Sequence, residues 1–124
     1  MGYFYIGFDY KNRKNGIFKI GQTVNLASRL SNIRHFDNFQ CLGYLELPEA
    51  TKSEMLFIES CVRLDLERIG FTQTQNDHFL YRIEQGKKYE QAAGIAQITL
   101  KFAIEACQIK KIPYEIGNKT FKRS

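Results

Sequence analysis

The stretch GIFKIGQTVNLASRL, from Gly16 to Leu30, predicts a strand that turns directly into a helix. Residues 17–20 form a short apolar run around one lysine, which is typical of a half-buried strand. Gly21 ends this strand, and Asn25 is the expected N-cap of a helix over residues 26–34. One glycine and three side chains that can contact a phosphate therefore crowd around a single turn: Lys19, Gly21, Thr23 and Arg29.

The residues before this stretch complete an antiparallel hairpin. Residues 2–8, GYFYIGF, are aromatic and rich in β-formers, and Asn15-Gly16 is a strong turn signal between two strands. The remaining pattern predicts a strand at 39–47, a helix at 51–69, a short strand at 78–83 and a helix at 84–110. We therefore expect a small α+β domain with a mostly antiparallel sheet of about three strands, flanked by helices, and an extra long C-terminal helix.

The helix predicted over residues 51–69 has one charged side chain on its apolar side. Thr51 and Glu54 have the spacing of a capping box. Glu59 then falls within the arc of the apolar stripe, and Arg63 follows one turn later. A carboxylate at such a place is paired, protonated or bound to a metal. Two interpretations stay open: a Glu59–Arg63 ion pair on the helix flank, or a carboxylate that points into a polar cleft and holds a divalent cation.

The hairpin places a second set of polar groups together. Tyr3 and Tyr5 share one face of the first strand, and Lys19 and Gly21 share one face of the second. If these faces coincide, a phenol and an ammonium stand side by side, and Arg29 can point back over them. The alternative is that the amphipathic tyrosines lie at the edge of the core and that Lys19 is a solvated residue that keeps an edge strand from pairing with another chain.

Composition limits the function classes. The chain of 124 residues predicts one domain, and its net charge of +5 favours a polyanionic partner such as nucleic acid. Three distant cysteines without a CxxC pair, with only two histidines, argue against a structural zinc site and indicate buried free thiols. The odd cysteine count, with no signal peptide, indicates a cytoplasmic location. No apolar run approaches the length of a membrane span, so we expect no membrane partner.

The order of these residues resembles the GIY-YIG nuclease superfamily. The segment GYFYI at residues 2–6 is similar to the first motif of that family, with Tyr5 at its tyrosine position. The segment FKIGQT at 18–23 is similar to the second motif. Arg29 follows Gly21 by eight positions, as the family arginine does.

Glu59 is similar to the metal-binding glutamate of that family, and the resemblance covers residues 2–79. It is closest to a branch in which the second motif reads KIG, with Lys19 in place of a tyrosine, and which is common in phage and bacterial genomes. That branch often carries E-x-x-x-H on the later helix and E-W-F after it. In this chain Arg63 stands at the histidine position, and Asp-His-Phe stands at 77–79.

The resemblance implies a metal-dependent endonuclease that hydrolyses the phosphodiester bonds of DNA. Glu59 would hold Mg²⁺ or Mn²⁺, and Arg29 would stabilise charge on the phosphate in the transition state. Tyr5 would orient or deprotonate the attacking water, and deprotonation needs its pKa to be lowered from about 10 by nearby cations. Lys19 would contact the phosphate or help to lower that pKa. The expected substrate-binding residues are Tyr3, Gly21, Thr23, His35 and Arg63.

Two other functions stay open. The chain could be a catalytically inactive nucleic-acid-binding module on the same scaffold, since its basic charge alone would support salt-sensitive binding. It could also be a protein-interaction or inhibitor domain, with the last helix as a docking surface or a homodimer contact. The expected organisation is a nuclease core over 1–83, a C-terminal helix over 84–110 packed on the same domain, and a basic tail over 111–124.

Overall fold

The computed structural model describes residues 1–9, 15–31, 40–75 and 77–117, without the side chains of Leu30 and Ser31. The described chain alternates strands with three helices. In chain order the elements are β1 (Gly2–Asp9), β2 (Asn15–Thr23), α1 (Leu26–Ser31), β3 (Gln40–Leu47), α2 (Lys52–Arg68), β4 (Thr72–Gln75), β5 (His78–Arg82), α3 (Lys88–Lys110) and β6 (Glu115–Ile116).

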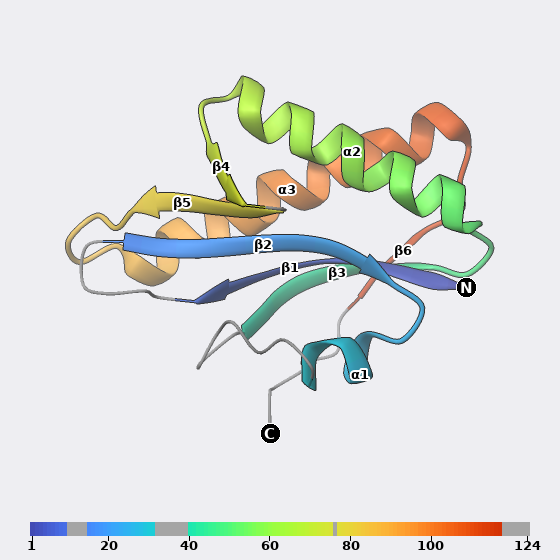
Figure 1. The fold of residues 1–124 in the computed structure, drawn as a ribbon, viewed down its shortest axis with the longest axis horizontal. Helices are drawn as coiled ribbons and strands as arrows, with labels where there is room; N and C mark the ends of the chain where they lie inside the picture. Colours follow the sequence, from blue (N-terminus) through green and yellow to red (C-terminus); the bar gives the residue numbers. More distant parts are fainter. Residues whose placement is uncertain (10–14, 32–39, 76, 118–124) are drawn as a thin grey trace.

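One antiparallel sheet runs through the molecule in the order β4-β5-β2-β1-β3-β6. Helices α2 and α3 cover one face, and the short α1 lies on the other (Figure 1). The α+β class is confirmed, but the expectation of about three strands is wrong, because the sheet has six. The two strands without any sequence signal are β4, which is the polar tetrapeptide TQTQ, and β6, which is only two residues long.

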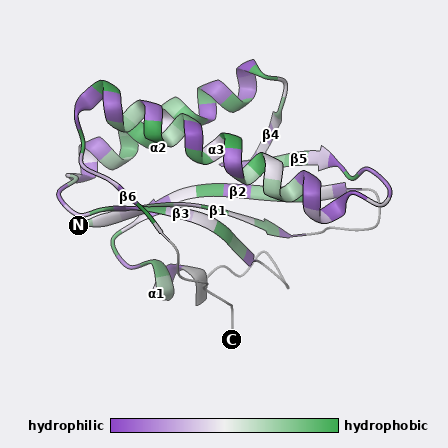
Figure 2. Cartoon of the chain, turned by 180° about the vertical axis from the view of Figure 1, so that it is seen from behind, coloured by the Kyte–Doolittle hydropathy of each residue, from purple (hydrophilic) through white to green (hydrophobic). Residues whose placement is uncertain are grey.

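The main core lies between the sheet and the helices α2 and α3. Alternate residues of β1 and β2 point toward these helices and are fully buried, as the period of two predicts. Figure 2 shows the matching pattern on the helices, with hydrophobic positions toward the sheet and hydrophilic positions outward. The buried stripe of α2 consists of Met55, Ile58, Val62 and Leu66.

Local sequence signals set the two ends of α2. The Thr51 hydroxyl accepts a hydrogen bond from the Glu54 backbone N–H at 3.1 Å, and the Glu54 carboxylate accepts one from the Thr51 N–H at 2.9 Å. This reciprocal pair is the expected capping box. The helix ends at Arg68, and Gly70 follows with φ of +110°. That left-handed value suits glycine after a helix C-terminus.

The last helix is part of the core. Helix α3 begins at Lys88, four residues later than expected, and it packs against α2 and the sheet. Along this helix, Ile95 is buried, Phe102 packs partly buried against the core, and Ile109 is 72% exposed. None of the helices in the described part of the chain combines the length and the apolar character that a bilayer crossing needs.

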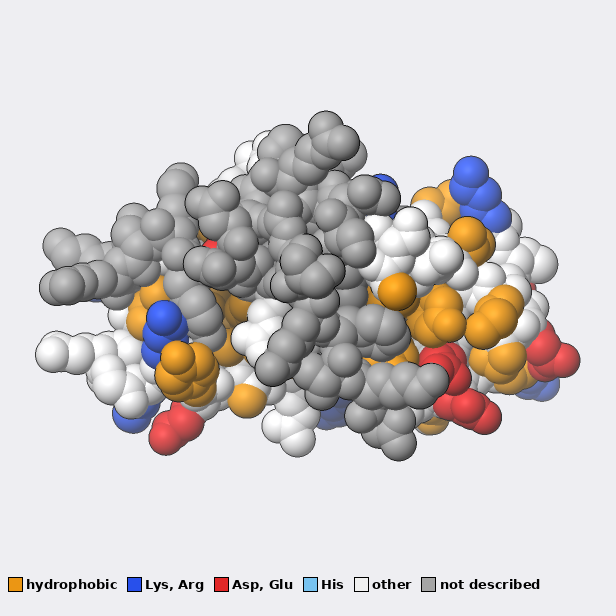
Figure 3. All heavy atoms as spheres, turned by 90° about the horizontal axis from the view of Figure 1, so that it is seen from below, with side chains coloured by type: hydrophobic (Ala, Val, Ile, Leu, Met, Phe, Trp, Pro, Cys, Tyr) orange, Lys and Arg blue, Asp and Glu red, His pale blue; other side chains and the backbone are white. Residues whose placement is uncertain are grey.

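A smaller cluster lies on the α1 face of the sheet. Its buried members are Tyr5, Leu26, Cys41 and Tyr44, so α1 is anchored mainly through Leu26. The expected N-cap of this helix is confirmed, since the Ser28 N–H donates to Asn25 Oδ1 at 3.1 Å. In the view of Figure 3, hydrophobic side chains lie next to charged ones on the described surface.

Candidate functional site

The candidate site lies at the C-terminal end of β2, beyond the point where β5 pairs with it. Strand β5 pairs with β2 only between Asn15 and Lys19. Beyond that point the Ile20 N–H donates to the Asp77 carbonyl oxygen at 3.1 Å. Among the described residues, 21–23 then pair only with β1. Side chains from α1 on one face and from α2 on the other can therefore approach the same stretch of backbone.

Tyr5 and Gly21 form the centre of this site. They are directly opposite each other in the β1–β2 register. A Cβ at Gly21 would lie 2.5 Å from the Tyr5 hydroxyl oxygen and 2.6 Å from its Cζ, so the phenol ring lies across the glycine. Tyr5 has no exposed surface, and no described residue completes a well-formed hydrogen bond with its buried hydroxyl. Gly21 is needed because the phenol occupies the space of a side chain.

Lys19 faces the same way as Tyr5. It stands opposite Gly7 on β1, two residues along from Tyr5, and opposite His78 on β5. Residues paired across antiparallel strands share a face, so the expected phenol and ammonium on one face are confirmed. Burial lowers the pKa of Lys19, the Asp77 carboxylate acts against that lowering, and the Arg29 guanidinium adds to it. Lys19 is thus a half-buried cation among other charges.

Arg29 approaches the phenol from the exposed side of α1. Burial raises the pKa of Tyr5 above its ordinary value, and the Arg29 guanidinium beside the hydroxyl only partly opposes the rise. The lowered pKa that deprotonation of water by Tyr5 would need is therefore not found. The reason is the packing of the α1-face cluster, which removes water from around the ring. At neutral pH Tyr5 is a protonated phenol, which can donate a hydrogen bond but is a poor base.

The second half of the site comes from α2. The expected Glu59–Arg63 ion pair is not formed, although both side chains lie in the described part of the chain. Arg63 Nη1 instead pairs with Asp77 Oδ1 at 3.2 Å, and Nη2 donates to Ser60 Oγ at 3.4 Å. Glu59 is half-buried next to this pair.

Glu59 is electrostatically unusual. Its pKa is raised from 4.5 to about 7, first by burial and then by a hydrogen bond with Asp77 and the charge of that carboxylate. The cations Arg63 and Lys19 act in the opposite direction without cancelling the rise. A neighbouring carboxylate disfavours the charged form of a carboxyl group, and a cation would act in the opposite direction. The charge of Glu59 also reaches Tyr5 and Lys19, so the two halves form one electrostatic unit.

The carboxyl pair is suited to one class of metal ion. Carboxylate oxygens are preferred by Mg²⁺ and Mn²⁺, and Mg²⁺ is commonly held by one or two carboxylates with water and substrate phosphate as the other ligands. Glu59 with Asp77 matches this pattern. In the described ranges, no group of three or more His, Cys, Asp or Glu side chains could enclose a metal by itself.

The other expected substrate-binding residues lie in different parts of the structure. Tyr3 lies opposite Thr23 on the face of Tyr5, with its ring 6.1 Å from that of Tyr44. The Thr23 hydroxyl is used locally, since it accepts from the Asn25 N–H at 3.2 Å and approaches the Asn25 carbonyl at 3.3 Å. It therefore shapes the turn before α1. His35 lies outside the described residues.

Asp77 is the site residue that the sequence reasoning missed. Its motif position was noted, but no role was predicted for it. It has φ of +59°, a left-handed backbone that Asp and Asn tolerate better than most residues. The adjacent pair Asn76-Asp77 before a strand is a turn signal that could have located this kink.

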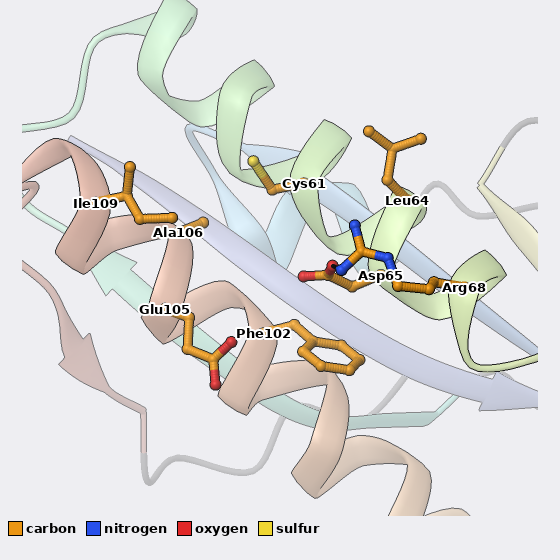
Figure 4. A pocket seen from close by; sticks show the side chains of 8 residues that line it. All are labelled: Cys61, Leu64, Asp65, Arg68, Phe102, Glu105, Ala106 and Ile109. Carbon is orange, nitrogen blue, oxygen red and sulfur yellow. Dashed lines mark ion pairs between the residues drawn. The ribbon is translucent and has the colours of Figure 1, made fainter.

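A separate hollow lies between α2 and α3. It has a volume of about 370 Å³, and the Arg68–Asp65 ion pair, at 3.1 Å, crosses its edge (Figure 4). None of the candidate residues at the β2 end lines it. Its lining residues are Cys61, Leu64, Asp65, Arg68, Phe102, Glu105, Ala106 and Ile109. The hollow is therefore distinct from the candidate site.

Comparison with known protein families gives one match, to the family model described as T5orf172 domain, over residues 2–92. The chain belongs to the T5orf172 domain family. This corrects the GIY-YIG resemblance, for which no match was found; its motifs are only a few residues long and therefore weakly specific. The T5orf172 domain family is nuclease-like and DNA-binding, which is compatible with a nucleic-acid-related role. No curated protein and no solved structure matches the chain.

Proposed function

We propose that this T5orf172 domain is a metal-dependent endonuclease that hydrolyses DNA phosphodiester bonds at the end of β2. The observation that carries the proposal is the convergence of three unlike groups. A buried phenol lies over Gly21, and the cations Lys19 and Arg29 lie within electrostatic range of it. The carboxyl groups of Glu59, on α2, and Asp77, just before β5, act on the same place. A site that only binds phosphate would gain nothing from the acids.

The cations have the role of holding the phosphate. The Arg29 guanidinium is a planar donor that can contact two phosphate oxygens, and it lies on the exposed side of α1, where a strand of DNA can reach it. Lys19 supplies a point charge from the sheet. Both cations would contact the phosphate oxygens more strongly as negative charge builds up in the transition state.

Tyr5 acts as a protonated phenol. Its raised pKa makes it a hydrogen-bond donor at neutral pH. The same hydroxyl can accept from a water molecule, so it can hold that water in line for attack without removing its proton. The fixed position of the ring over Gly21 supports this orienting role.

Glu59 is the proposed ligand of Mg²⁺ or Mn²⁺. Such a cation would supply Lewis-acid polarisation of the phosphate and charge neutralisation at the leaving oxygen. Within the chain, Glu59 must be deprotonated before it can serve as a ligand, and its pKa is raised to about 7. Its charge acts on both Tyr5 and Lys19, so the carboxyl group lies within electrostatic range of the β2 end.

A cleavage assay tests the proposal. Supercoiled plasmid and single-stranded DNA are incubated with the chain in Mg²⁺, Mn²⁺ or EDTA, and the Glu59→Gln variant is compared with Glu67→Gln. Glu67 lies on the same helix but is exposed, so it is the matched control. We expect metal-dependent nicking that falls at least 100-fold in Glu59→Gln, a typical loss for a catalytic group, and stays unchanged in Glu67→Gln.

Three outcomes count against the proposal. Cleavage that persists in EDTA contradicts the metal, and equal losses in both variants contradict the special role of Glu59. Salt-sensitive DNA binding without cleavage of any substrate would instead favour a binding module on this scaffold.

A further inference from the structure

Arg63 is placed where it would ordinarily neutralise Glu59. The two residues are one helical turn apart on α2, a spacing at which Glu and Arg attract each other on a helix surface. In the structure, however, Arg63 turns to Asp77 Oδ1 at 3.2 Å, fourteen residues further along the chain. Glu59 is thereby left without an ion-pair partner within the described residues.

Asp77 is itself held firmly. Its carbonyl oxygen accepts from the Ile20 N–H at 3.1 Å, and its N–H donates to Gln73 Oε1 at 2.8 Å. Its backbone adopts a left-handed conformation, and its side chain is only 14% exposed. These contacts fix the carboxylate at the end of β2, so Arg63 must come to it.

We propose that Asp77 is a positioning residue that draws Arg63 away from Glu59 and so keeps Glu59 available as a cation ligand. The inference rests on the proposed function of Glu59 and extends it. The driving force is the geometry of the carboxylate. Asp77 offers Arg63 a largely buried anion that its backbone contacts hold in place, whereas the Glu59 side chain is only half-buried. A buried, hydrogen-bonded pair holds a guanidinium better than an exposed pair on a helix surface.

The critical variant is Asp77→Asn. Asparagine tolerates the left-handed backbone and keeps the shape of the side chain, but it removes the charge that holds Arg63. We expect Arg63 to move to Glu59, so that affinity for Mn²⁺ alone, measured by calorimetry, falls about 10- to 100-fold, the usual effect of removing a supporting residue. In cleavage, the metal concentration needed for half-maximal rate rises by a similar factor.

The double variant Asp77→Asn/Arg63→Gln separates positioning from direct ligation. If Asp77 acts by holding Arg63, loss of the arginine restores Mn²⁺ affinity to within a few-fold of wild type. If Asp77 were itself an indispensable ligand, the double variant would stay as weak as the single one, and the inference would be overturned.

The second ion pair of α2 provides a charge-matched control. Arg68 pairs with Asp65 at 3.1 Å on the exposed side of the helix. Asp77→Asn/Arg68→Gln has the same net charge as the rescuing double variant but leaves Arg63 in place. We expect no recovery from it, and recovery equal to that of Arg63→Gln would overturn the inference in favour of a net-charge effect.

The same measurements distinguish this inference from the proposed function. Unchanged Mn²⁺ affinity in Asp77→Asn, with tight binding by wild type that Glu59→Gln abolishes, overturns the role of Asp77 alone. Wild type that binds no Mn²⁺ overturns both. Thermal unfolding of every variant shows whether the fold is kept, and the rescue by Arg63→Gln cannot be produced by a variant that fails to fold.

Discussion

Replacing Gly21 with alanine tests the geometry on which the candidate site depends. The new methyl group would lie 2.5 Å from the hydroxyl oxygen of Tyr5, 2.6 Å from Cζ and 2.8 Å from Cε1. Non-bonded heavy atoms prefer about 3.5 to 4.0 Å, so the ring must retreat by about 1 Å. It has little room, because Tyr5 is fully buried in a cluster with Leu26, Cys41 and Tyr44.

The cost follows from the overpacking of a buried ring. Such changes destabilise by about 1 to 3 kcal/mol, which for a domain of this size lowers Tm by about 4 to 12 °C. The cleavage rate should fall by more than the loss of folded protein explains, since the phenol moves away from the position where it orients water. Thermal unfolding and plasmid nicking at a temperature well below Tm measure the two effects separately.

Gly94 provides the matched control, because a Cβ there meets nothing within 4 Å and the residue lies within the exposed side of α3. Alanine at that position should stabilise the chain by about 0.5 to 1 kcal/mol. In the Tyr5→Ala background, Gly21→Ala should cost almost nothing, because the ring that it strikes is gone. Gly21→Ala with wild-type Tm and wild-type cleavage would refute the placement of the phenol over Gly21.

Three further predictions concern Tyr5, Glu59 and Thr51. Tyr5→Phe removes a buried hydroxyl, so we expect stability to be equal or up to about 1 kcal/mol higher while nicking falls about 100-fold; a stability loss with normal nicking would contradict the orienting role. For Glu59, the pKa is raised from 4.5 to about 7 in the fold, so the folded chain keeps a proton that the unfolded chain has lost. Without metal, the free energy of unfolding should therefore fall as pH rises from about 4.5 to about 7, by about 1 kcal/mol after allowance for solvent screening, and denaturant titrations of Glu59→Gln should lack this slope. Thr51→Ala removes the capping box of α2 and should cost about 1 kcal/mol by urea unfolding, whereas Thr51→Ser should cost far less.

The strand-to-helix stretch could be predicted from sequence because its signals are local. The period of two placed Tyr5 and Lys19 on one face, and Asn25 capped α1 as its side chain allows. The strands β4 and β6 could not be predicted, because TQTQ and a pair of residues carry no apolar alternation. They are strands only because β5 and β3 offer hydrogen-bonding edges next to them.

The site was predicted in part for the same reason. Glu59 was found because it interrupts the apolar stripe of its own helix. Asp77 was not, because its role depends on contacts with Arg63 and Ile20, which are distant in the sequence. The raised pKa of Tyr5 could not be predicted from sequence, because its burial depends on how Leu26, a residue of another element, packs over the sheet.

The distribution of charge across the end of β2 favours catalysis over simple binding. The cations Lys19 and Arg29 act on the phenol side, whereas the acid Glu59 comes from α2 and Asp77 from the residue before β5. A phosphodiester that reached the cations would also meet the field of the acids, which repels it. A protein that only binds DNA would be better without these carboxyl groups. They become favourable when a cation lies between them and the phosphate, because it then attracts both. The raised pKa of Glu59 has the same physical origin, since a carboxyl pair without a cation takes up a proton to reduce the repulsion.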